Sequence, residues 1–481
     1  MELSVRRSNT PLPRSARTEG YNDRNEYRER EPKLREIDVL GIGFGPSNLA
    51  LAVAFDELGV SERCHFIEQA PDCNWQSGML LDGSDIQNNP IRDLVTPRDP
   101  QSYYTFINYL KQNERLFEYL NLGLAYPLRK EYARYIRWVA SHFKHLVTYS
   151  SRVTSVELLP RGIDGGFCWC VTTVDNVRYI ARCLVVGTGR TPNIPKIFRS
   201  HLGPRIFHLN DYLPNTRRFL PESARSIAVI GASQSAVEIV LDLMARFPSV
   251  EIQAIHRSFG FRQKDTSPFS DQVYFPDFTE YFYNAPAEAK QNLNQQLRAT
   301  NYSSADIDVI HRLYVQIYEE RLDGNRRVHM RSNMQIVAVE PVDGEYRLTL
   351  REQNTGAICT VFADTVVLAT GFLDLGAGGA SERYPALLGA ISSHLDVDAQ
   401  GVLRVNRDYS VEVDAGIDPP ALYLNGLCES SHGLGDAGSF SMLALRSMDI
   451  ARSALERSLV RGARADPRDQ HAFLIQSEDR C

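Results

Sequence analysis

A pattern of strand, glycine turn, helix and strand occurs twice in this chain and constrains its fold more than any other feature. In the first copy an apolar strand leads into Gly43, and an acid, Glu68, ends the following strand 25 residues later. In the second copy the turn begins at Gly231, and Arg257 follows the next strand 26 residues later. A unit of this kind places phosphates at the first amides of its helix. The chain is therefore expected to hold two dinucleotide-binding units.

Each unit is followed by the same kind of antiparallel meander and a late return strand. The segments are 153–158, 167–174 and 179–189 after the first unit, and 336–340, 346–351 and 361–371 after the second. A lone glycine turn is weak evidence, whereas a doubled unit with matching downstream segments is specific. The predicted fold class is α/β, with two Rossmann-like dinucleotide-binding domains and a small helical insertion.

The residues at the ends of the second strands indicate which nucleotides bind. Glu68 is able to accept hydrogen bonds from ribose hydroxyls, which suits FAD or NAD, and Arg257 suits the 2′-phosphate of NADPH. Alternatively, Arg257 is a solvated charge at a strand end, and Glu68 is a surface acid that faces a helix. The predicted contacts are Gly43, Gly45, Pro46, Ser47 and Asn48 in the first turn and Gly231, Ser233, Gln234 and Ser235 in the second. Ser233 replaces a glycine, and its hydroxyl is expected to face the phosphates.

These segments predict an order of domains along the chain. Residues 264–325 change to helical periodicity and form a helical substrate segment inside the second unit. The predicted parts are a mobile N-terminal tail (1–35), the FAD domain (36–205 and 373–461), the NADPH domain (206–263 and 326–372) and a C-terminal tail (462–481).

Composition excludes several classes of protein. The net charge of −6 does not favour nucleic acid or an anionic membrane, and no apolar run approaches the length of a spanning helix. Eight scattered cysteines without a CxxC motif or zinc spacing predict reduced thiols, no metal site and a cytoplasmic location. Without a reactive cysteine pair, reduced flavin is expected to pass its electrons to oxygen or a quinone.

Several motifs resemble those of a known family, the flavin-dependent N-hydroxylating monooxygenases, which include the ornithine and lysine N-monooxygenases of siderophore biosynthesis. The resemblance covers about residues 37–455. The motifs that carry it are Gly41–Ala50, Trp75–Leu81, Ile91–Thr96, Phe106–Leu110, Gly231–Ala236, Asp265–Phe269, Thr300–Tyr302, Asp364–Phe372 and His432–Leu434.

The resemblance implies an NADPH-dependent flavin enzyme that hydroxylates a primary amine through a C4a-hydroperoxyflavin. The neutral amine attacks the distal oxygen, so the protein needs no nucleophilic side chain of its own. By position, the resemblance implies that Gln87 lies near the flavin and that Asn301 and Ser441 lie at the substrate. It further implies cofactor contacts from Trp75, Gln87, Thr370, Gly371, Gly433 and Leu434.

The chain departs from the family pattern where the substrate is expected to bind. Arg92 stands in place of a lysine that binds the substrate carboxylate, and Asp271 stands in place of an asparagine. Arg92 keeps the cation and permits bidentate binding, and Asp271 is able to hold an ammonium group. The two are alternatively a structural ion pair. Gln76 replaces a histidine, and one residue is inserted near Gly438.

The substrate is expected to be an amino acid with a free amine, with ornithine or lysine first and a short acidic amino acid such as aspartate as a rival. A diamine is third. Other classes also stay open. A Baeyer–Villiger or sulfur-oxidising monooxygenase shares both nucleotide sites, although its histidine motif is incomplete around His208, and Ser233 alone supports a non-catalytic flavin-binding protein. The expected partners are a small amine substrate and O2, and a homo-oligomer (dimer or tetramer) is predicted.

Overall fold

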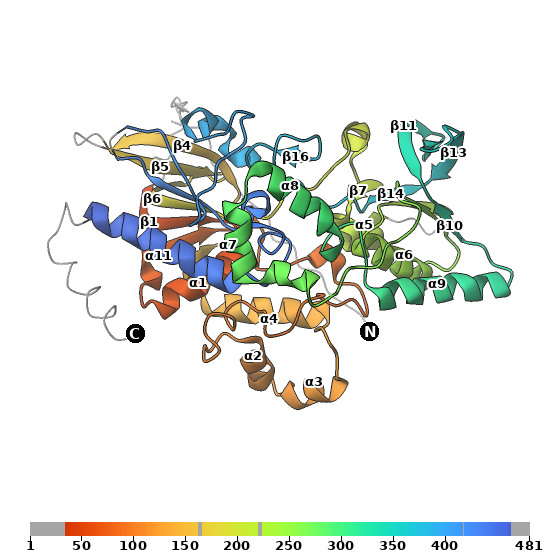
Figure 1. Ribbon diagram of the computed structural model, residues 1–481, viewed down its shortest axis with the longest axis horizontal. Coiled ribbons are helices and arrows are strands. Elements are labelled where there is room, and N and C mark those ends of the chain that lie inside the picture. The colour runs from red at the N-terminus through yellow and green to blue at the C-terminus, as the bar shows by residue number, and fades with distance from the viewer. Residues whose placement is uncertain (1–33, 162–165, 220–223, 417, 463–481) are drawn as a thin grey trace, which may run out of the picture.

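The computed structural model describes residues 34–161, 166–219, 224–416 and 418–462 (Figure 1). The predicted tails lie outside this part except at residues 34, 35 and 462. The first strand begins at Leu34, two residues before the predicted start of the FAD domain. The added residues belong to the sheet because Leu34–Glu36 pair in parallel with Arg178–Ile180.

An eight-stranded sheet carries the first predicted unit. Its main path runs β17-β18-β6-β1-β2-β3, and β5 joins it through β6. The strands are β1 (Leu34–Ile42), β2 (Cys64–Ile67), β3 (Val147–Thr148), β4 (Val153–Arg161), β5 (Gly166–Thr173), β6 (Arg178–Val186), β17 (Ser410–Val411) and β18 (Ala421–Leu424). Because β1 pairs in parallel on both sides, its carboxyl end opens onto the glycine turn.

A five-stranded parallel sheet, in the order β10-β9-β8-β14-β7, carries the second unit. Its strands are β7 (Ile206–His208), β8 (Ser226–Ile230), β9 (Glu251–Ile255), β10 (Val328–Arg331) and β14 (Thr365–Leu368). A parallel sheet is covered on both faces, which explains why β8 and β14 are almost entirely apolar. The two sheets confirm the predicted α/β fold.

The second meander differs from the expected pattern at its return strand. Its sheet contains β11 (Met334–Val342), β12 (Glu345–Glu352) and β13 (Ile358–Ala363). The predicted return segment over 361–371 is divided into β13 and β14 at Asp364. The Asp364 carboxylate accepts hydrogen bonds from the amides of Arg225 (2.7 Å) and Ser226 (3.0 Å), so the chain changes sheets there.

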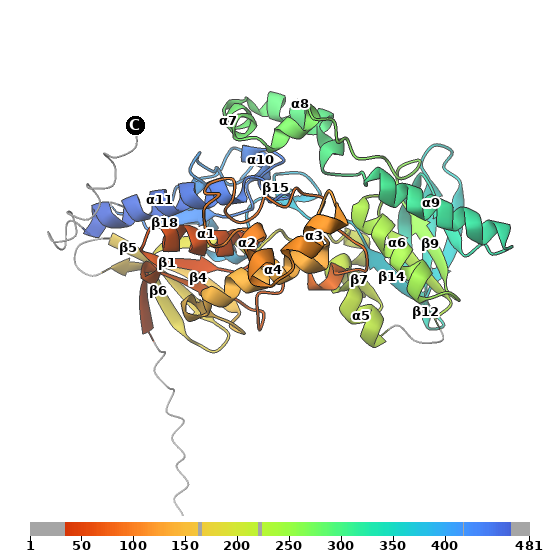
Figure 2. The same ribbon diagram turned by 90° about the horizontal axis from the view of Figure 1, so that it is seen from below.

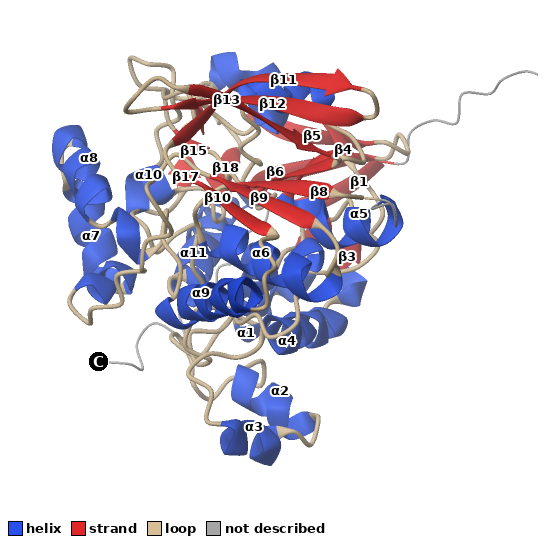
Figure 3. Cartoon of the chain, turned by 90° about the vertical axis from the view of Figure 1, so that its right-hand side faces the viewer, coloured by secondary structure: helices blue, strands red, loops and turns tan. Residues whose placement is uncertain are grey.

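Helices cover the sheets and separate them. The main ones are α1 (Pro46–Glu57), α2 (Phe106–Gln112), α3 (Leu116–Leu122), α4 (Arg129–His142), α5 (Tyr212–Phe219), α6 (Gln234–Arg246), α7 (Pro276–Asn284), α8 (Ala287–Gln296), α9 (Ile307–Leu322), α10 (Glu429–His432) and α11 (Leu443–Gly462). Figure 2 shows α7 and α8 on the outside of the molecule near α10, and in Figure 3 α2 and α3 project at the bottom, below α1 and α4. Within the described ranges, no helix has the length and apolarity that a membrane crossing requires.

Candidate active site

The first glycine turn is shaped for close approach by a phosphate. Gly43 has a φ of 87°, and a Cβ there would lie 2.5 Å from the carbonyl oxygen of Gly187. A Cβ on Gly45 would meet nothing within 4 Å, so this side of the turn is open. The buried Asn48 amide donates to the Gly43 carbonyl (2.7 Å) and fixes the turn. The first amides of α1 have no partner within the helix, as an anion site requires.

Glu68 lies at the end of β2 beside this turn. Its carboxylate accepts hydrogen bonds from the amides of Phe44 (2.7 Å) and Ala70 (2.7 Å). A carboxylate has about four acceptor positions, so Glu68 keeps free lone pairs for ribose hydroxyls. The geometry fits the adenosine half of FAD.

A buried arginine near the C-terminus also supports the first turn, and the sequence analysis missed it. Arg446 donates to the Asp436 carboxylate (2.6 Å), to the Asn425 side-chain oxygen (2.9 Å) and to the Ser47 hydroxyl (3.2 Å). Both charged side chains of the Arg446–Asp436 pair are 1% exposed. The pair joins residues 425–446 to the start of α1. No local sequence pattern predicts the contact between Arg446 and Ser47, because these two residues lie 399 positions apart in the chain.

The second glycine turn has the same approach geometry but a different set of contacts. A Cβ on Gly231 would lie 2.3 Å from the Ala369 carbonyl oxygen. The Ser233 hydroxyl, expected to face the phosphates, donates instead to the carbonyl of Ser304 (3.2 Å), and the Gln234 amide donates to the same oxygen (3.0 Å). The helical segment therefore contacts the start of α6, directly before Ser235.

Arg257 is exposed at the end of β9. Its carbonyl accepts a hydrogen bond from Gln353 (2.8 Å), and its guanidinium forms no ion pair with any residue that the structure describes. A cation without an acidic partner at this position is free to bind a 2′-phosphate. The Nδ1 atom of the neighbouring His256 lies 2.8 Å from the Ser258 carbonyl oxygen.

The other predicted cofactor residues lie where the two sheets are joined or beside the substrate residues. The Thr370 hydroxyl donates to the Asn193 carbonyl (2.5 Å), and the backbone amide of Asn193 donates to the carbonyl of Gly371 (2.9 Å). These bonds pair the segment after β6 with the segment after β14, which we call the first and second connecting segments. Gly433 has a φ of 94° and is followed by the buried Leu434. The Trp75 ring packs edge-on against Phe440, with 5.1 Å between centroids.

Gln87 links the two units through the helical segment. It has a φ of 52°, and its amide donates to the carboxylate of Asp306 (2.5 Å). The Asp306 backbone amide in turn donates to the Gln234 side chain (2.9 Å). Burial raises the pKa of Asp306. The Asp85 carboxylate accepts a hydrogen bond from the backbone amide of Gln87 (2.9 Å). Burial raises the pKa of Asp85 to about 6.

A buried ion pair holds the two units together beside Gln87. Arg129, at the start of α4, donates to both carboxylate oxygens of Glu238 in α6 (2.9 and 3.0 Å) and to the Met79 carbonyl (2.9 Å). The Gln234 amide donates to the same carboxylate (3.0 Å). The pair fixes α4 against α6 next to Gln87, and the sequence analysis missed it.

The predicted substrate residues converge. The Arg92 guanidinium donates to the Ser441 hydroxyl (3.4 Å) and lies 5.8 Å from the centroid of the Tyr274 ring. The Tyr274 hydroxyl donates to the carbonyl of Thr300 (3.1 Å), directly before Asn301. The Asn301 side-chain nitrogen is buried and has no hydrogen-bond partner in the described part of the chain. An unpartnered buried donor is suited to a carboxylate ligand.

Arg92 and Asp271 do not form an ion pair in the structure. A structural ion pair was the alternative to substrate binding for these two residues. No Arg92–Asp271 pair occurs among the ion pairs of the described residues. Burial raises the pKa of Asp271, and the charges of Lys264 and Arg92 oppose that shift. The charge of Arg92 therefore acts on the Asp271 carboxyl, although the two side chains form no ion pair.

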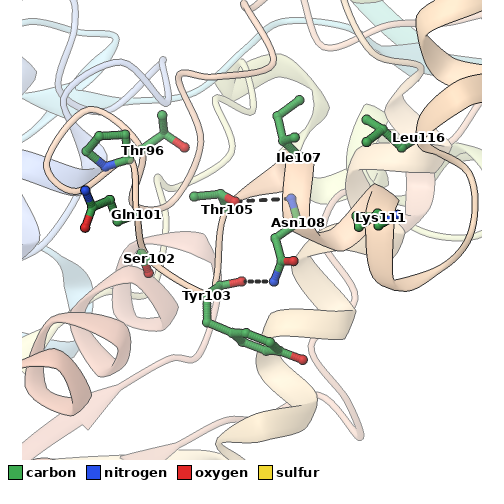
Figure 4. A pocket seen from close by; sticks show the side chains of 10 residues that line it. Thr96, Gln101, Ser102, Tyr103, Thr105, Ile107, Asn108, Lys111 and Leu116 are labelled. Carbon is green, nitrogen blue, oxygen red and sulfur yellow. Dashed lines mark hydrogen bonds between the residues drawn. The ribbon is translucent and has the colours of Figure 1, made fainter.

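An open pocket on the α2–α3 side is separate from these residues. Figure 4 shows this cavity of about 590 Å³, where the Thr105 hydroxyl accepts from the Asn108 amide (3.2 Å). It is lined by Thr96, Pro100, Gln101, Ser102, Tyr103, Thr105, Ile107, Asn108, Lys111 and Leu116. None of the predicted site residues lines it, and it brings no acid and base together.

The raised pKa of Asp85 predicts a pH-dependent stability. The folded protein holds the Asp85 proton up to about pH 6, whereas the ordinary pKa is 3.8, so the contribution of Asp85 to stability is greatest below pH 3.8 and is lost as pH rises towards 6. We expect Asp85→Asn to be more stable than the parent by about 1–2 kcal/mol above pH 6, since Asp85 is partly solvated. Urea unfolding at pH 4.5 and 7.5 measures this. A constant difference across pH, or the same response in the exposed Asp175→Asn control, would contradict it.

Two phosphate-binding turns lie at the ends of parallel strands in two sheets, and buried polar contacts such as Arg129–Glu238 join the two units. This arrangement defines the class of proteins that bind two dinucleotides. Residues 35–374 match the model of the family described as L-lysine 6-monooxygenase/L-ornithine 5-monooxygenase. The chain belongs to this family. It is a flavin amine N-hydroxylase, and the family and enzyme class predicted from the motifs are confirmed.

Individual relatives agree with this assignment. The chain is 38% identical over 429 residues to an L-ornithine N(5)-monooxygenase from Burkholderia cepacia, covering 87% of this chain and 94% of the relative. It is similar to the structure of an ornithine N-hydroxylase from Kutzneria sp. 744, with a TM-score of 0.80, 31% identity and coverage of 88% and 99%. A cadaverine monooxygenase from Erwinia amylovora has a TM-score of 0.75, 25% identity and coverage of 88% and 95%.

Proposed function

We propose that this chain is an FAD- and NADPH-dependent monooxygenase that hydroxylates the side-chain amine of L-ornithine. The observation that carries the proposal is the contact of Arg92 with Ser441, with Tyr274 between Arg92 and the segment that holds Asn301. The relatives named as ornithine hydroxylases support the same substrate. The Arg92 guanidinium at Ser441 and the unpartnered Asn301 amide would together provide a subsite for an α-carboxylate.

The cofactors are FAD at the first turn and NADPH at the second. Bound FAD, reduced by NADPH, supplies the oxygen-activating chemistry. The chain supplies binding through the α1 and α6 turns, Glu68 at the ribose and Arg257 at the 2′-phosphate. Gln87 lies between the two units, and Asp306 orients its amide. O2 as co-substrate, a homo-oligomer and a cytoplasmic location belong to the same proposal.

The charges of the substrate subsite favour an amino acid with one carboxylate. Arg92 binds the α-carboxylate, and Asp271 is placed to hold the α-ammonium, because the two side chains are near each other without pairing. Aspartate is the rival that the longer Arg92 side chain favours, yet its second carboxylate would face Asp271. A diamine lacks a carboxylate for Arg92 and gains only the contact with Asp271.

A panel of amines tests the proposal. L-Ornithine, L-lysine, L-aspartate and cadaverine are compared by hydroxylamine formed per NADPH consumed, because NADPH oxidation alone also reports futile peroxide release. We expect ornithine to give the highest ratio and the lowest KM. A preference for aspartate or cadaverine would move the substrate to a rival. Product from a ketone or thioether instead would indicate another monooxygenase class, and no NADPH oxidation would indicate a binding protein.

Arg257 predicts the choice of coenzyme. Replacing it with alanine removes a charge-assisted contact with the 2′-phosphate worth about 1.5–3 kcal/mol, so selectivity for NADPH over NADH is expected to fall about ten- to a hundredfold. The rate with NADH is expected to change little. Anaerobic flavin reduction with each coenzyme measures this. Equal losses with both coenzymes would show that Arg257 does not contact the phosphate.

A further inference from the structure

A cluster of polar side chains lies where the two connecting segments meet the helical segment. Arg190, which follows β6, donates to the Tyr302 hydroxyl (2.8 Å) and to the carboxylate of Asp374 (3.1 Å), and lies 3.6 Å from the Glu429 carboxylate. The Tyr302 hydroxyl donates to Glu429. The Arg190 side chain is 14% exposed and that of Glu429 is 7% exposed. The assigned function uses none of these groups.

The cluster is rigid because of its surroundings. The Arg190 guanidinium lies between two rings, 5.5 Å from the centroid of Tyr302 and 5.3 Å from that of Phe372. Phe372 belongs to the second connecting segment, which pairs with the first through a bridge to Pro192. Arg190 thus joins both connecting segments to the helical segment, and Glu429 joins them to the start of α10.

The cluster ends at the substrate subsite. Tyr302 directly follows Asn301, whose buried amide nitrogen has no partner in the described chain. The loop before Ser441 packs on both residues: a Cβ at Gly438 would lie 2.4 Å from the Asn301 nitrogen and 2.6 Å from the Tyr302 oxygen. Any movement of Tyr302 therefore displaces the Asn301 amide or this loop.

We propose that Arg190 is a positioning residue for N-hydroxylation, which fixes Tyr302 and thereby holds the Asn301 amide at the substrate subsite. The proposal rests on the function argued above. The buried Arg190 contacts two rings and forms hydrogen bonds with two chain segments. It restricts the positions of its partners more than a surface ion pair would, because each partner has few alternative positions. Burial also raises the pKa of Glu429 to about 8. Near neutral pH the charge of Arg190 is therefore balanced mainly by Asp374, and Glu429 acts as a hydrogen-bond partner.

The test compares Arg190→Gln, Arg190→Lys, Tyr302→Phe and the double variant Arg190→Gln/Tyr302→Phe in the FAD-loaded enzyme with ornithine. We expect Arg190→Gln and Tyr302→Phe each to raise KM about tenfold, the size of one lost hydrogen bond to a charged group, and to lower hydroxylamine per NADPH. FAD content and anaerobic reduction by NADPH should stay within about twofold of the parent. Arg190→Lys should recover part of the KM. The double variant should resemble either single variant, because both remove the same coupling.

Two further variants separate positioning from stability. Gly438→Ala pushes on the same Asn301 and Tyr302 atoms from the other side and should raise KM without removing a charge. Arg347→Gln removes the exposed ion pair to Glu340 in the three-stranded sheet and should leave KM unchanged. A lower Tm with unchanged KM and coupling in Arg190→Gln, or additive effects in the double variant, would overturn the proposal. If Arg190→Gln does not fold, an unchanged KM in Tyr302→Phe would overturn it. Absence of hydroxylamine from the parent enzyme would instead refute the proposed function.

Discussion

Replacing Arg92 with alanine is expected to raise the KM for ornithine about 30- to 150-fold. The lost contact is a charged hydrogen bond in a partly buried site, worth about 2–3 kcal/mol, and each 1.36 kcal/mol corresponds to a factor of ten. The variant should still be reduced by NADPH, because Arg257 and the α6 turn lie on the other unit. It should then consume NADPH and release peroxide without hydroxylating. Steady-state KM together with hydroxylamine and peroxide yields measures both effects.

Two comparisons define the Arg92 experiment. Arg92→Lys keeps the cation and should recover most of the KM, whereas the exposed Lys111→Ala on α2 should change nothing. If the substrate is a diamine, removing Arg92 removes a repulsive cation, and KM for cadaverine should hold or fall. An unchanged KM for every amino acid tested would end the assignment of Arg92 to the carboxylate.

Breaking the buried Arg446–Asp436 pair is expected to cost about 3–5 kcal/mol of stability, because either single replacement leaves a desolvated charge without its partner. Asp436→Asn and Arg446→Met each remove one side of the pair, which is 1% exposed on both sides. Arg446 also contacts Ser47 at the start of α1, so both variants should lose FAD more readily on dilution. Urea unfolding and the flavin content of the purified protein measure these effects.

The matched control is Arg347→Ala, which removes an exposed ion pair with a typical contribution of about 0–1 kcal/mol. The double variant Arg446→Met/Asp436→Asn should be more stable than either single variant, because it leaves no unpaired buried charge. Single variants as stable as the parent, with full flavin content, would show that the pair supports neither the fold nor the first turn.

Residues near in sequence predicted much of the fold. The two glycine turns, the helices after them and the meanders were expected within a few residues, because strand and helix periodicity and turn chemistry are local properties. Within the segment predicted to be helical, 264–325, helix α8 ends at Gln296 and is followed by a 3-10 turn over Arg298–Thr300. The predicted return segment over 361–371 is divided at Asp364. Its two amide partners, Arg225 and Ser226, are distant in sequence, so no local pattern revealed the break.

By itself, the sequence determined the doubled unit, the turn glycines and the residue types at the strand ends, because backbone approach and charge depend on single positions. Only the tertiary structure decided that Arg92 lies with Ser441 rather than pairing with Asp271, that the Ser233 hydroxyl turns to Ser304, and that Arg446 supports α1. These contacts join side chains separated by up to 399 residues, and neither periodicity nor spacing encodes such a distance. These contacts form because packing of the two units brings distant polar groups together. A polar group that is buried without a hydrogen-bond partner is costly, so such groups pair with one another.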